Sequence, residues 1–148
     1  MDTPTPLVTP QTIEAAARLA RGRLHRTPLF RSETLSARSG FEVYLKAESL
    51  QKTGSFKARG ALNRVLHLEP GEAARGVVAA SAGNHAQGLA FAAAEAGVRV
   101  RVVMPASAQP AKIEATRAYG AEVELAGDRK STRLNSSHIQ KSRMPSSA

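Results

Sequence analysis

A lysine and an asparagine, each at the start of an expected helix, are the residues of this chain best placed for chemistry. Lys57 follows a loop at 51–56, the lysine loop, in which Gly54 allows a tight turn. Ser55 is expected to cap a helix that runs to about His67. Lys57 then lies in the first helical turn, where the helix dipole disfavours a second positive charge. This position favours the neutral amine, the form that makes a Schiff base with an aldehyde.

The second candidate is the asparagine loop, residues 81–85, which follows an expected buried strand and leads into a helix that begins at Asn84 or His85. Ligands of open parallel sheets bind at the carboxyl ends of the strands, and unpaired N–H groups at a helix start bind anions. The asparagine loop is therefore a candidate anion site. Structural alternatives exist for each residue: a basic helix start for Lys57, a core position for Phe56, a helix cap for Asn84 and an exposed surface position for His85.

The remaining sequence supplies the elements that must position these two loops. Apolar alternation and short β-branched runs predict strands at 41–48, 77–80, 98–104 and 121–125. Helical spacing and end signals predict helices at 10–21, 33–37, 55–67, 84–96 and 109–119. From residue 77 onward strands and helices alternate, which predicts right-handed parallel crossovers. The expected fold class is α/β, an open parallel sheet with flanking helices.

Composition excludes several classes of function. The formal charge of +9 suggests nucleic acid, but residues 128–148 alone hold five Lys or Arg residues against one Asp. With four Phe, two Tyr and no Trp, the aromatic residues are too few and dispersed for a base-stacking surface. The absence of cysteine excludes disulfides and thiolate metal sites, and four scattered histidines have no metal-ligand spacing. No apolar run is long enough to span a membrane and no signal peptide is evident, so a cytoplasmic location is expected.

Two strings carry a resemblance to a known family. Residues 51–61 closely resemble the lysine motif of the fold type II, tryptophan-synthase-like pyridoxal-phosphate enzymes. Residues 81–88 are similar to the asparagine loop of one branch of that family, the threonine dehydratases and serine racemases. The resemblance covers nearly all of residues 9–125 but only the front part of a family enzyme.

The resemblance implies that pyridoxal phosphate is the cofactor. Lys57 would hold it as a Schiff base and later take the α-proton of the substrate, Phe56 would stack beside its ring, and Asn84 would meet its ring hydroxyl. The carboxylate of the amino-acid substrate would be bound by Ser81, Gly83, Asn84 and His85. The implied reaction converts threonine or serine to a 2-oxo acid and ammonia.

Ala82 separates the members of this branch. Enzymes that resemble serine racemase have a second serine here, whose hydroxyl is the acid and base on the face opposite the lysine. Ala82 has no proton to give, so the sequence favours the one-faced elimination of a dehydratase. The alternatives are a serine racemase or another fold type II enzyme. A non-catalytic anion-binding module and a basic nucleic-acid-binding protein are rival classes.

The resemblance also sets the expected organisation of the chain. Residues 1–127 are expected to be the incomplete N-terminal part of a dehydratase catalytic domain, because the family's glycine-run loop for the cofactor phosphate would come later. Residues 128–148 resemble a translated sequencing adapter and are expected to be a non-native tail, with a natural Ser-rich disordered terminus as the alternative. The full-length parent is expected to be a homo-oligomeric enzyme of amino-acid metabolism, such as isoleucine biosynthesis, with no nucleic-acid, membrane or metal partner.

We expect the chain as written to be inactive. Without the phosphate loop a cofactor bound to Lys57 is not oriented and exchanges freely with water. Purified chain with added pyridoxal phosphate should release no ammonia from threonine, and its unpaired strand edge at 121–125 should leave apolar surface that binds the dye ANS. Ammonia release that depends on Lys57 would contradict this expectation.

Overall fold

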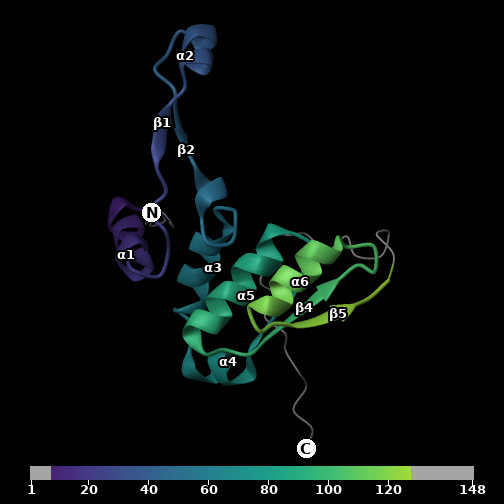
Figure 1. The fold of residues 1–148 in the computed structure, drawn as a ribbon. Coiled ribbons are helices and arrows are strands. Elements are labelled where there is room, and N and C mark those ends of the chain that lie inside the picture. Colours follow the sequence, from purple (N-terminus) through teal and green to yellow (C-terminus); the bar gives the residue numbers. More distant parts are fainter. Residues whose placement is uncertain (1–7, 128–148) are drawn as a thin grey trace, which may run out of the picture.

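A computed structural model describes residues 8–127, in which six α-helices and five strands form a body and a projecting arm (Figure 1). The helices are α1 (Pro10–Ala20), α2 (Glu33–Ser39), α3 (Lys57–Val65), α4 (Pro70–Arg75), α5 (Asn84–Ala96) and α6 (Pro110–Ala118), with a 3₁₀ turn η1 (Glu48–Leu50). The strands are β1 (Leu29–Arg31), β2 (Tyr44–Lys46), β3 (Val77–Ala80), β4 (Val100–Met104) and β5 (Glu122–Leu125). Residues 128–148, the expected tail, lie outside the described residues.

The body contains a parallel sheet with the strand order β3-β4-β5. Val78 pairs with Arg101, and Val102 pairs with Val123. Helix α5 connects β3 to β4 and contacts both strands, and α6 connects β4 to β5 and contacts β5. The prediction of parallel α/β units is therefore confirmed, because an antiparallel hairpin of β3 and β4 would have contradicted it.

The core lies where α5 packs between α3 and the sheet. Residues 86–93 of α5 are all buried, and most of them are small. The largest fully buried side chains come from α3, α5, β4 and α6: Leu62, Leu89, Met104, Val102 and Thr116. Small side chains let the helix axes approach closely, so the alanine-rich sequence of α5 has a packing explanation.

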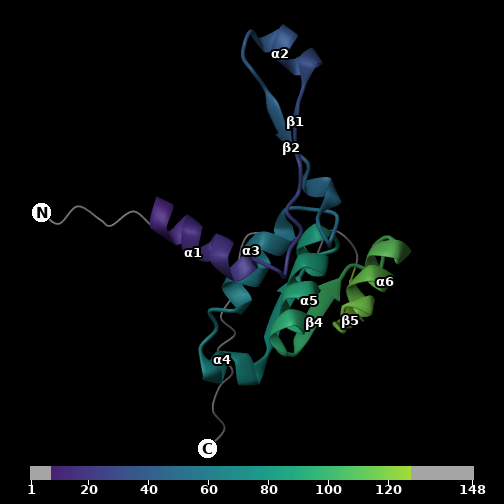
Figure 2. The ribbon, with the colours of Figure 1, turned by 60° about the vertical axis from the view of Figure 1, so that its left-hand side comes forward.

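The arm consists of β1, α2 and β2, and it projects from the body in both views (Figures 1 and 2). The two strands pair antiparallel, with Leu29 opposite Lys46 and Arg31 opposite Tyr44. All six strand residues are exposed. The predicted half-buried strand at 41–48 was therefore too long and its burial wrong, because a two-stranded ribbon has too little surface to cover a face.

Most predicted helix ends are confirmed. Thr9 and Thr12 form a reciprocal capping box at the start of α1, with Pro10 as its first residue. The Ser32 hydroxyl accepts the Leu35 N–H at the start of α2, and Gly97 ends α5 in the left-handed conformation.

Two predicted helix ends were wrong. Helix α3 begins at Lys57 without a side-chain cap, and the Ser55 hydroxyl is buried without a hydrogen-bond partner among the described residues. The segment around Pro70 was expected only to end a helix, yet it begins α4. Pro70 is the first helical residue there, and the Glu72 carboxylate accepts the Glu69 N–H at 3.2 Å.

Two further observations are limited to residues 8–127. No helix there is long and apolar enough to cross a membrane. No group of three or more His, Cys, Asp or Glu residues gathers there as a potential metal site.

Gly88 permits the close approach of α3 to α5, and this can be tested by substitution. A Cβ at Gly88 would lie 3.0 Å from the carbonyl carbon and 3.1 Å from the carbonyl oxygen of Lys57. Gly88→Ala should overpack this contact at a cost of about 1–3 kcal/mol, offset by about 1 kcal/mol of helix propensity. We expect a net loss of about 1 kcal/mol in the free energy of unfolding, measured with urea.

Gly60→Ala is the matched control, because a Cβ at this exposed position of α3 meets no atom within 4 Å. It should stabilise the chain by about 0.5–1 kcal/mol through helix propensity alone. Equal stabilisation by both substitutions would show that the contact at Gly88 has room for a methyl group.

Candidate active site

Lys57 is the first residue of α3, as the sequence predicts for a helix-start lysine. Its Nζ lies 5.2 Å from the centre of the Phe56 ring. The Phe56 side chain is 61% exposed, so the alternative core role of Phe56 is wrong. The structure thus presents an amine and an aromatic ring next to each other at the surface.

The asparagine loop follows directly from the sheet. The Ser81 N–H donates to the Val103 carbonyl at 3.0 Å and so extends the pairing of β3 with β4 by one residue. The Gly83 N–H lies 3.4 Å from the Ser81 hydroxyl oxygen. Gly83 precedes α5, and no side chain caps the start of this helix. Uncapped N–H groups in the first turn suit an anion.

The lysine and asparagine motifs lie side by side because of Gly88. The backbone of Lys57 lies directly against Gly88. Asn84 is four residues before Gly88, one turn earlier on the same face of α5. Two segments separated by more than twenty residues in the sequence therefore meet at one end of the α3–α5 contact.

His85 is half-buried beside Lys57, so the alternative of a fully exposed surface histidine is wrong. Burial lowers the pKa of His85 below its ordinary value, and the positive charge of Lys57 lowers that pKa further. At neutral pH the imidazole is therefore uncharged and adds no positive charge next to Lys57.

Lys112 is a site residue that sequence reasoning missed. It lies in the first turn of α6, and its Nζ donates to the Asn84 side-chain oxygen at 2.9 Å. Asn84 is the first residue of α5 and bonds Lys112 through its side chain, so the alternative of a plain helix cap is wrong. Lysines are common on exposed helix faces, and no sequence signal distinguishes this one.

The lysine loop is held to the N-terminal segment by Gln51. The buried Gln51 amide donates to the His25 carbonyl at 3.0 Å and accepts the His25 N–H at 2.9 Å. It mimics a strand partner for that residue. On the other side of the loop, the Tyr119 hydroxyl donates to the Lys52 carbonyl at 3.0 Å.

A charged network fixes the first turn of α3. Arg59 donates to both carboxylate oxygens of Glu48, at 2.8 and 2.7 Å, and the Thr27 hydroxyl donates to the same carboxylate at 2.6 Å. The hydrogen bonds from Arg59 are the main reason that the pKa of Glu48 falls to about 2. Because the folded pKa is depressed, this contribution to stability is complete above the ordinary pKa of 4.5 and is lost as the pH falls toward 2.

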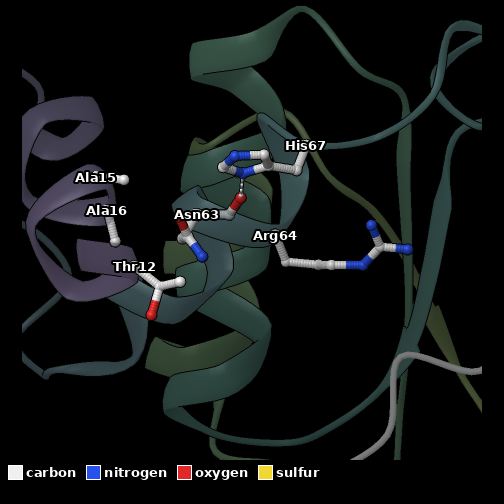
Figure 3. Close-up of a pocket in the computed structure, with 6 residues that line it drawn as sticks. All are labelled: Thr12, Ala15, Ala16, Asn63, Arg64 and His67. Carbon is white, nitrogen blue, oxygen red and sulfur yellow. Dashed lines mark hydrogen bonds between the residues drawn. The ribbon is translucent and has the colours of Figure 1, made fainter. Parts of the chain in front are cut away.

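Two cavities lie away from these residues. One of about 300 Å³ lies between α1 and α3, lined by Thr12, Ala15, Ala16, Asn63, Arg64 and His67 (Figure 3). In Figure 3 the Arg64 side chain points away from α1, and the His67 ring bonds the Asn63 carbonyl at 2.7 Å. The other, of about 500 Å³, lies at the opposite end of the strands from the asparagine loop, lined by residues that include Gly76, Arg99 and Glu122. Neither contains a predicted site residue.

Comparison with known proteins identifies the family. The sequence profile described as "Pyridoxal-phosphate dependent enzyme" matches residues 20–143. The chain belongs to this family. Its parallel sheet with flanking helices is the front part of the fold type II architecture, which the solved structures of its relatives share.

Relatives in this pyridoxal-phosphate family include an L-threonine ammonia-lyase of Thermotoga maritima, 52% identical over 82% of this chain and 30% of that protein. Among solved structures, a bacterial threonine deaminase is 48% identical with a TM-score of 0.71, covering 85% of this chain and 39% of the other. Serine racemase from Dictyostelium discoideum is 38% identical with a TM-score of 0.75, covering 84% and 41%. The chain spans about a third of the length of the curated relatives it matches.

The electrostatic coupling of Lys57 to His85 gives a prediction for NMR titration. The pKa of His85 should lie below 6.5. Lys57→Gln should raise that pKa without restoring it, because burial is the larger cause. The C2 proton shift of His85 measured against pH tests both statements.

Lys52→Gln is the matched control, since the Lys52 ammonium lies over the Phe91 ring, at 5.3 Å from its centre. It should leave the pKa of His85 unchanged. Equal shifts in the two variants would mean that the charge of Lys57 is not specifically close to the imidazole. The lowered pKa also implies that folding stability falls as the pH drops below 6.5, because the unfolded chain binds the proton more readily.

Proposed function

We propose that the chain is the N-terminal part of a pyridoxal-phosphate-dependent threonine/serine ammonia-lyase, with residues 1–127 as part of its catalytic domain. The observation that carries the proposal is the contact at Gly88, which brings Lys57 next to the asparagine loop. The 52% identity to an L-threonine ammonia-lyase supports the choice of reaction.

The residues at this contact fit the cofactor in their chemistry. Lys57 offers an amine for its aldehyde, the exposed Phe56 ring lies beside that amine, and Asn84 offers a side-chain amide for its ring hydroxyl. The cofactor, when bound, supplies an electron-withdrawing ring that stabilises negative charge at the α-carbon of the amino acid. The neighbouring His85 is uncharged at neutral pH because its pKa is lowered, so it does not repel a cationic amine.

The asparagine loop is proposed to bind the substrate carboxylate. Ser81, Gly83, Asn84 and His85 surround the uncapped start of α5, where backbone N–H groups and the helix dipole favour a negative charge. A carboxylate held there keeps the amino acid in one orientation. The α-carbon is then presented toward the Lys57 side of the contact.

Lys57 is proposed to take the α-proton after its amine has been freed. The β-hydroxyl leaves, so one water is lost across the Cα–Cβ bond, and hydrolysis of the resulting imine takes one water back. The products are a 2-oxo acid and ammonia. Ala82, exposed between Ser81 and Gly83, has no group to deliver a proton from the opposite face, which favours elimination over racemisation.

The proposal extends to the setting of the enzyme. Its partner is a free hydroxy amino acid, threonine or serine, as the names of its relatives suggest. We place the complete protein in the cytoplasm as a homo-oligomer, following the family resemblance. Sedimentation of the complete protein tests the assembly.

The decisive test uses the protein extended to the full length of its relatives. Borohydride reduction of the cofactor-loaded protein followed by peptide mass mapping should place the cofactor on Lys57. Lys57→Ala should remove the attachment and lower release of 2-oxo acid from threonine by about 10²–10⁴-fold. Cofactor found on another lysine would refute the assignment.

Lys52→Ala is the control in the same loop and should keep both the attachment and the reaction. A serine substrate separates the alternatives. Faster formation of D-serine than of 2-oxo acid would identify a racemase instead, and absence of both products with intact cofactor binding would leave a non-catalytic module.

A further inference from the structure

Lys112 and Asn84 form a hydrogen bond whose direction is fixed by chemistry. The lysine ammonium has donors only, so the atom of Asn84 at 2.9 Å from Nζ must be the side-chain oxygen Oδ1. The two ends of an asparagine amide are otherwise hard to distinguish. Here the partner decides which end faces α6.

This bond leaves the other end of the amide committed. With Oδ1 held by Lys112, the Nδ2 group carries two N–H donors that point away from Lys112. A free asparagine can turn either its oxygen or its nitrogen toward a ligand. A held asparagine presents donors only, which suits an oxygen that carries negative charge.

The setting of Lys112 is electrostatically unfavourable unless the residue has a role. It lies in the first turn of α6 and reaches the first residue of α5, so its ammonium sits near the positive ends of two helix dipoles. Among the described residues Lys112 takes part in none of the six ion pairs. Its partner is the amide oxygen of Asn84.

Helix α6 is anchored so that Lys112 stays in place. Ile113 and Thr116 are buried, and the Thr116 hydroxyl donates to the Lys112 carbonyl at 2.8 Å. At the far end of the helix, Tyr119 packs edge-on against the Phe91 ring of α5, with 5.8 Å between ring centres. The base of Lys112 therefore moves with α5.

We propose that Lys112 is a positioning residue that orients the Asn84 amide, so that its N–H donors face the ring oxygen of the cofactor. The inference rests on the proposed function, because it assumes that Asn84 meets the cofactor. It assigns Lys112 no contact with the cofactor or the substrate. A direct contact between Lys112 and a bound anion is the competing explanation.

The first experiment needs no cofactor. In the isotope-labelled chain, Lys112→Met should shift the ¹³Cγ and ¹⁵Nδ2 resonances of Asn84, because the charged hydrogen bond to Oδ1 is lost. Arg117→Met removes one positive charge from an exposed position of the same helix and should leave both resonances in place. Unshifted Asn84 resonances in Lys112→Met would overturn the inference, whatever the reaction of the protein is.

The second experiment measures pyridoxal phosphate affinity by absorbance titration of the protein extended to the length of its relatives. Lys112→Met should weaken binding about tenfold, and Lys112→Arg should stay within about threefold because guanidinium also only donates. In the Asn84→Ala background, Lys112→Met should cause no further loss. Thermal melting of each variant confirms that it is folded.

The outcomes separate the inference from the proposed function. A further loss on adding Lys112→Met to Asn84→Ala would overturn the positioning role alone and show that Lys112 contacts the bound molecule itself. Unchanged affinity in Asn84→Ala would overturn both, since Asn84 would then not meet the cofactor.

Discussion

The contact between the start of α3 and the first two turns of α5 is the constraint on which the site depends. Each loop alone is an ordinary surface turn: one exposes a lysine and an aromatic ring, the other an uncapped helix start. The missing side chain of Gly88 lets the Lys57 backbone reach α5. Burial of small residues along α5 then supplies the hydrophobic free energy that keeps the helices together.

The surrounding hydrogen bonds hold the lysine loop from two directions. Gln51 fastens it to the segment that precedes the arm, and the Glu48–Arg59 pair fastens the first turn of α3 to η1 and Thr27. A lysine meant to react must be partly exposed, so it gains little from its own burial. Its position is therefore set by buried polar neighbours, while its side chain remains free.

Much of the body was predictable because its signals are local. The β-branched run before Ser81, the glycine after Ala96 and the proline at the start of α6 each have one dominant structural meaning. The arm and the start of α3 were not, because their structure depends on partners distant in sequence. The bond between Lys112 and Asn84 spans 28 residues, and neither residue type signals the other. Gly88 was part of a recognised string, but only the structure shows what its missing Cβ permits.

Helix α6 touches both halves of the site: Lys112 bonds Asn84 near its start, and Tyr119 bonds the Lys52 carbonyl beyond its end. A helix is stiff along its axis, so these two bonds act as a bracket of fixed length. When α6 shifts, it carries the lysine loop and the asparagine loop in the same direction. The distance between an amine and an amide contributed by different segments is thereby insulated from motions that tilt the sheet as a whole.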